Sequence, residues 1–143
     1  MRVGPDEFGP LRTSMAEMSK RYDDIRVARP YERDLKTLDD TDAIVVIGSR
    51  RQVMDIAGCA ACGFSGEPNG CRAAAAAGAS CAYNSKDLGI AVCSAALVAH
   101  QALVDNRVID TVGRSIVAYG LYPEYTVHRV QDVVTVAISV ASW

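Results

Sequence analysis

Four of the five cysteines in this 143-residue sequence fall within one short segment. Their spacing is Cys59-x2-Cys62-x8-Cys71-x9-Cys81. A two-residue gap allows the thiolates of Cys59 and Cys62 to reach one metal centre. A structural zinc site usually contains two close pairs, whereas an iron–sulfur cluster also accepts one pair and two single cysteines. The spacing therefore favours a cluster, with structural zinc as the alternative.

Small residues surround these cysteines. Glycine lets the backbone approach a metal centre and aim its amides at thiolate sulfur atoms, and alanine leaves room for a bulky group. Two disulfides would need an oxidising compartment, for which the sequence gives no argument. The small residues are Gly58, Ala60, Ala61, Gly63, Gly66, Gly70, Ala73–Ala77 and Gly78.

The elements that must position this segment are a few strands and helices. The β-branched run at 43–48 is typical of a buried strand, and the compositions of 25–28 and 133–140 also predict strands. Apolar spacing predicts helices near 14–22, 85–103 and 107–119, the last ending at Gly120. A short helix is expected after Cys71. The fold class is therefore α/β or α+β, with a glycine- and cysteine-rich loop that binds the cluster.

The chain length allows one domain, residues 1–143, with a hydrophobic core. Residues 1–13 contain Gly4, Pro5, Gly9 and Pro10 and predict a loose N-terminal arm. Residues 58–84 form the expected iron–sulfur-binding segment. The second half is rich in Ile, Val, Leu and Ala, so we expect a homo-oligomer that covers the apolar surface.

Composition excludes several function classes. The net charge is −2, without a basic field that would attract nucleic acid. The apolar stretches are too short or too interrupted to span a bilayer, and the N-terminus does not have the pattern of a secretion signal. We therefore expect a cytoplasmic protein that binds neither membrane nor nucleic acid.

Several blocks of the sequence resemble an uncharacterised prokaryotic family described as containing a ferredoxin domain. They are Asp42–Gly48, Gly58–Phe64, Cys71, Cys81–Asn84, Asp87–Ile90 and Val104–Arg107. The resemblance implies a 4Fe–4S cluster on the four matching cysteines, Cys59, Cys62, Cys71 and Cys81. This sequence departs from the family by a longer loop, Ser65–Gly70, and by shorter ends, which suggest that a partner subunit covers exposed core.

Three functions follow from such a site. A cluster with four cysteine ligands transfers single electrons, so the first is an electron carrier or redox subunit with a redox partner protein docking near the Gly66–Gly70 loop. The second is an enzyme whose cluster keeps one iron open for Lewis-acid or sulfur-transfer chemistry, with Asp87, Asp105 or His100 as candidate acid–base groups. The third is a structural or sensing module. We expect a carrier rather than a stand-alone enzyme.

The remaining cysteine and the polar residues near these blocks have simpler interpretations. Cys93 is expected to pack as a small core residue on a helix that is covered nearly all round, with replacement of a missing ligand or a redox role as the alternative. Asn84, Asp87 and the run Asp105–Arg107 are expected to cap helices, with a structural salt bridge or a place near the cluster as the alternative. No nucleotide-binding or protease motif is found.

Overall fold

The computed structural model describes residues 1–50, 52–65, 70–123 and 130–139, with the backbone alone described for residues 130–132. Its strands form one antiparallel sheet in the order β1-β2-β4-β3. The strands are β1 (Arg2–Val3), β2 (Ala43–Arg50), β3 (Asp105–Ile109) and β4 (Val130–Ser139). Together with the helices, this sheet confirms the predicted class and makes it α+β.

The two central strands are the ones that the β-branched runs predict. β2 covers the predicted 43–48, and β4 covers the described part of the predicted 133–140, since residue 140 lies outside the described residues. The strands pair in the register Val45 opposite Val136. Ile44 and Val46 face the larger core, while Val45 faces the opposite layer. Both faces of β2 therefore contact apolar residues, as a continuous β-branched run predicts.

The N-terminal residues are not a loose arm, and this prediction was wrong. They form β1, a short 3-10 turn (η1, Pro5–Glu7) and the start of helix α1 (Phe8–Lys20), which begins six residues before the predicted 14–22. The Gly4 amide donates to Glu7 Oε2 at 2.9 Å and caps the turn. Pro5 and Pro10 lie in first turns, where a missing N–H breaks no helical hydrogen bond.

Residues 25–28 are helical, which corrects the predicted strand. They begin helix α2 (Ile25–Thr37), followed by the 3-10 turn η2 (Leu38–Asp40). The side chain of Asp24 caps α2 by accepting the Arg26 amide at 2.9 Å. Ala28 and Tyr31 then bury one face at helical spacing. The cap and this packing outweigh the strand preference of Ile25 and Val27.

The last predicted helix begins later than expected. Residues 107–109 belong to β3, which pairs with β4, and helix α5 (Asp110–Tyr119) follows directly. Asp105–Arg107 therefore lie in a strand and do not cap helices, because backbone pairing with β4 satisfies this segment. Gly120 ends α5 in the left-handed conformation (φ 58°), as predicted.

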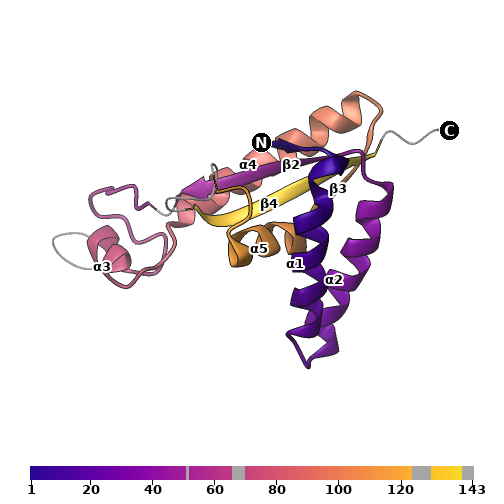
Figure 1. Cartoon of the computed structure of the whole chain (residues 1–143). Coiled ribbons are helices and arrows are strands. Elements are labelled where there is room, and N and C mark those ends of the chain that lie inside the picture. Colours follow the sequence, from indigo (N-terminus) through magenta and orange to yellow (C-terminus); the bar gives the residue numbers. More distant parts are fainter. Residues whose placement is uncertain (51, 66–69, 124–129, 140–143) are drawn as a thin grey trace.

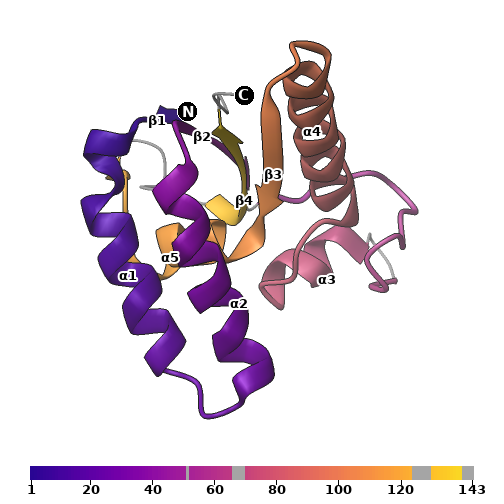
Figure 2. The same cartoon turned by 90° about the vertical axis from the view of Figure 1, so that its right-hand side faces the viewer.

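Helices cover the two faces of the sheet unequally. α1, α2 and α5 pack on one face and α4 (Ala82–Gln101) lies on the other (Figures 1 and 2). The larger core lies under the three helices and includes Phe8, Leu11, Ile44 and Ile116. The smaller core joins the buried side chains of α4 to Val136 of β4.

α4 is covered on one side alone, contrary to the prediction that it is covered nearly all round. Leu88 and Val92 are buried, but Ile90 is 66%, Leu97 55% and Val98 64% exposed. One helix on one sheet face can bury only one stripe of side chains. Among the described residues no helix combines the length and apolar character needed to cross a membrane.

Candidate iron–sulfur site

The four clustered cysteines lie on an excursion of the chain beyond one end of the sheet. The chain leaves the sheet after β2, forms the short helix α3 (Gly70–Ala76) expected after Cys71, and returns at the start of α4 (Figure 1). α3 projects away from the core that α1, α2 and α5 form (Figure 1). The fold thus gathers the cysteines in one region that contributes nothing to the larger core.

The first two cysteines lie on consecutive turns. The Cys59 amide donates to the Ile56 carbonyl at 3.2 Å, and the Gly63 amide donates to the Ala60 carbonyl at 2.9 Å. Gly63 has φ 83°, a conformation that glycine adopts without strain. Both thiols are half-buried. The turns therefore leave Cys59 and Cys62 close to the surface of the molecule.

Gly70 holds the first pair of cysteines against the third. A Cβ at this position would lie 2.2 Å from the carbonyl oxygen of Phe64 and 3.0 Å from that of Cys59. The start of α3 therefore packs directly on the backbone that carries Cys59 and Cys62. Cys71, the next residue, is 4% exposed, and its thiol donates to the Ile56 carbonyl at 3.9 Å.

Cys81 occupies the N-cap position of α4. Burial raises the pKa of its thiol, but the nearby backbone amides of Asn84, Tyr83 and Met54 favour the thiolate and lower the pKa further than burial raises it. The net pKa lies below that of an ordinary cysteine, with Asp87 opposing the shift through its charge. The start of α4 thus favours a thiolate, the form that binds metal.

The donor set fits an iron–sulfur cluster, although the four thiols do not meet at one point in this structure. Within the described ranges, no group of three or more His, Cys, Asp or Glu side chains is close enough to hold a metal ion. The fit rests on four free thiols on one excursion, an amide-rich environment at Cys81, and small residues around them. The ligand assignment Cys59, Cys62, Cys71 and Cys81 stays a prediction.

Cys93 is not a core residue, which corrects the packing interpretation. It is exposed on α4, because its side of the helix faces away from the sheet. Cys93 lies twelve positions after Cys81, which corresponds to about 18 Å along a helix. That separation also argues against Cys93 as a replacement ligand.

A groove of about 320 Å³ lies between the end of β2 and the first turns of α4, and its lining residues Met54 and Asp87 also act on Cys81. Asn84 lines it too, and its side-chain amide donates to the carbonyl oxygens of Arg50 and Gln52. Asn84 was expected to cap a helix, and it instead fastens α4 to the end of β2. The groove is lined by Ile47, Gly48, Ser49, Arg50, Gln52, Met54, Asn84, Asp87, Leu88 and Ala91.

The candidate acid–base residues separate into two places. Asp87 lines the groove and acts electrostatically on Cys81. His100 lies in the last turn of α4 and Asp105 begins β3, so both lie at the opposite end of the helix. The 20 residues of α4 span about 30 Å, so these two residues are remote from the cysteines.

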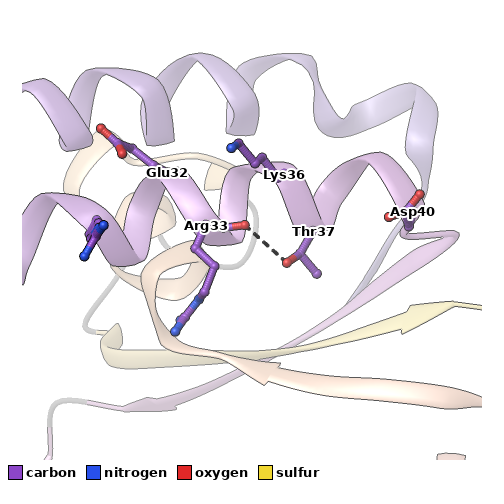
Figure 3. Close-up of a pocket in the computed structure, with 6 residues that line it drawn as sticks. Glu32, Arg33, Lys36, Thr37 and Asp40 are labelled. Carbon is purple, nitrogen blue, oxygen red and sulfur yellow. Dashed lines mark hydrogen bonds between the residues drawn. The ribbon is translucent and has the colours of Figure 1, made fainter.

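A larger hollow of about 580 Å³ lies on α2 and holds no cysteine (Figure 3). The described residues that line it come from one stretch of chain, residues 29–40, which covers α2 and η2. Thr37 bonds to the carbonyl oxygen of Arg33 at 3.3 Å within this stretch. The lining residues are Arg29, Glu32, Arg33, Lys36, Thr37 and Asp40. We do not assign this surface to the site.

The sequence did not reveal every residue of this region. The amide of Met54 reaches Cys81 from 27 positions away, and no local pattern predicts such a contact. Gly70 could be recognised as one of several glycines but not as the one in close contact. The expected docking surface at Gly66–Gly70 lies outside the described residues except for Gly70.

Comparison with known proteins supports the iron–sulfur interpretation. Searches of curated proteins and of solved structures give no match to the chain. A protein-family model matches residues 77–142, a range that includes Cys81 and excludes Cys59, Cys62 and Cys71. A ferredoxin domain is an iron–sulfur module, and nothing in this match supports zinc. Over residues 77–142 the chain thus matches the family described as "uncharacterized protein containing a ferredoxin domain (DUF2148)", which confirms the resemblance seen in its sequence.

Proposed function

We propose that the protein is an electron carrier or redox subunit whose 4Fe–4S cluster is held by Cys59, Cys62, Cys71 and Cys81. The observation that carries this proposal is the gathering of all four thiols on one excursion at the end of the sheet. The family match adjoins that excursion and names a ferredoxin domain. A cluster bound through four thiolates supplies the transfer of single electrons.

The backbone around Cys81 supports this role. The amides of Met54, Tyr83 and Asn84 lie near one sulfur atom and favour its negative charge. Hydrogen bonds to ligand sulfur are one of the means by which a protein sets the reduction potential of a cluster. Asp87 acts in the opposite direction through its charge. These four residues would therefore adjust the potential of the site.

A redox partner protein is expected to dock over the first two cysteines. Cys59 and Cys62 are half-buried, so electrons would travel a short distance to the surface there. Met54 is 49% and Ile56 41% exposed in the same segment, which gives this surface an apolar component. Transient redox partners bind through small surfaces of this kind.

The groove beside Cys81 favours a second candidate function. A small molecule bound there would lie next to a ligand of the cluster, with Asp87 as a nearby carboxylate and Met54 and Leu88 as apolar walls. This arrangement suits an enzyme in which three of the cysteines bind the cluster and one iron stays open. His100 and Asp105 are too remote to serve that reaction.

Single cysteine substitutions test the ligand set and separate the two candidates. We expect Cys59→Ser, Cys62→Ser, Cys71→Ser and Cys81→Ser each to lower the iron content and to abolish reversible reduction by dithionite. Cys93→Ser is the matched control and should keep both. Full iron content and reversible reduction in a variant of one of the four would contradict the four-ligand carrier. Such a variant would favour the open-site enzyme instead, in which three cysteines hold the cluster and the fourth is not a ligand.

A further inference from the structure

β3 forms an open edge of the sheet. Among the described residues it pairs with β4 alone and is the last strand in the order β1-β2-β4-β3, while the other edge is the two-residue β1. Asp105, Arg107 and Val108 of β3 are exposed, and Val108 is 48% exposed. An edge strand presents unpaired N–H and C=O groups that can pair with another chain. Within the described ranges, β3 therefore offers an edge of five residues for β-pairing.

The side chains of β3 divide between the two faces of the sheet. Ile109 belongs to the larger core, so Asp105 and Arg107 lie on the same face by alternation. Val108 pairs with Val136 and lies on the face that α4 covers. Neither Asp105 nor Arg107 has an ion-pair partner in the part of the chain that the structure describes. Two opposite charges thus stand two residues apart, unpaired, on an open edge.

The charges on two copies of β3 are complementary when the strands pair in one particular register. A second copy can add antiparallel to β3 about a twofold axis perpendicular to the sheet, which places side chains of the same face opposite one another. An axis at Asn106 sets each Asp105 opposite Arg107 of the second copy, so two ion pairs form. The same register sets each Val108 opposite Val104 of the second copy, on the face that α4 covers.

The other registers with comparable overlap are unfavourable. An axis at Arg107 places the two Arg107 side chains opposite each other, and like charges directly opposite are destabilising. An axis at Val108 sets Arg107 opposite Ile109 and leaves Asp105 outside the paired segment. The charges of β3 therefore favour the register centred on Asn106 over these two alternatives.

We propose that the protein forms a twofold homodimer through antiparallel pairing of β3 with β3 of a second copy, centred on Asn106. The two four-stranded sheets then form one continuous sheet of eight strands, β1-β2-β4-β3 followed by its symmetric equivalent. The cysteines lie at the opposite end of α4 and are left accessible. The proposal is independent of the cluster, because none of the pairing residues belongs to the candidate site.

Charge reversal tests the register directly. The full chain should have twice its 15.3 kDa mass by light scattering and sedimentation equilibrium. We expect Arg107→Asp alone, and Asp105→Arg alone, to weaken the dimer by about tenfold or more, because each creates two like-charge contacts. The double variant Asp105→Arg/Arg107→Asp should restore the dimer. Arg29→Asp, an exposed charge change on α2, is the matched control and should leave the mass unchanged.

Three results would overturn the proposal. The first is a wild-type chain that stays monomeric across the concentration range. The second is a dimer whose stability neither single reversal changes. The third is a dimer broken by Leu97→Glu on the exposed face of α4 but not by Arg107→Asp, which would place the interface on that helix. Circular dichroism of each variant confirms that a change in mass does not come from unfolding.

Discussion

Gly70 joins the two halves of the candidate site through a contact that no other residue permits. The start of α3 lies so close to the backbone of Phe64 and Cys59 that a Cβ would overlap the Phe64 carbonyl. Cys71 follows Gly70 directly, so the same contact sets the position of the third cysteine relative to the first two. The site therefore depends on glycine, which has no side chain, at position 70 as well as on the four thiols.

We predict that Gly70→Ala lowers the iron bound per chain, because α3 or the Cys59–Phe64 segment must move apart to admit the methyl group. Iron and sulfide analysis of protein purified without oxygen measures this effect. Gly89→Ala is the matched control, since no atom lies within 4 Å of a Cβ at that exposed position in α4. It should keep the metal and stabilise the helix by about 0.5–1 kcal/mol. Equal iron content in the two variants would contradict this role of Gly70.

The candidate ligands could be predicted from the sequence, whereas their surroundings could not. The spacing of cysteines along the chain can be seen in the sequence itself, so the four candidate ligands and the glycines around them could be identified from it. The amide of Met54 and the tie from Asn84 to the end of β2 depend on how α4 packs, which spacing does not encode. Cys93 was placed in the core because its neighbours are apolar, but a single sheet face cannot cover both sides of α4.

At the scale of elements, α5 packs on β4 through another close contact. A Cβ at Gly113 would lie 1.8 Å from the carbonyl oxygen of Val133, so the helix and the strand touch backbone to backbone. The neighbours of Gly113 in the same helix, Val112 and Ile116, are fully buried in the larger core. Separating the two elements would therefore open that core.

We predict that Gly113→Ala destabilises the fold by about 1–3 kcal/mol. The added methyl group would overlap the backbone of β4, which cannot adopt another rotamer as a side chain can. Urea denaturation followed by circular dichroism measures the change, with Gly89→Ala again as the control. The loss should appear in the metal-free protein too, since Gly113 lies in the main core. Unchanged stability would show that α5 does not pack on β4 as closely as described.

Helices and strands could be predicted where the sequence carries a strong local signal. The β-branched run of β2 and the Gly120 end of α5 follow from composition alone. The errors arose where a tertiary contact decided the outcome. Residues 25–28 carry strand-forming side chains, but the Asp24 cap and the packing of Tyr31 make them helical. Residues 107–109 begin a segment with the apolar spacing of a helix, but they pair with β4 and form an edge strand.

For the whole molecule, α4 separates two regions with different roles. The candidate cluster site lies at its start, whereas β3 begins beyond its other end, and the 20 residues of the helix span about 30 Å. A redox partner at the cysteines and a second copy at β3 could therefore bind at the same time without overlap. This arrangement would give a dimer with one accessible redox site in each half.

The central claim is that the four cysteines hold a 4Fe–4S cluster, and metal analysis tests it most directly. Protein purified without oxygen should contain about four irons and four sulfides per chain, with a brown colour that dithionite bleaches. That result would support the account and direct attention to the redox partner. Colourless protein with about one zinc per chain, or protein purified in this way that contains neither iron nor sulfide, would contradict it.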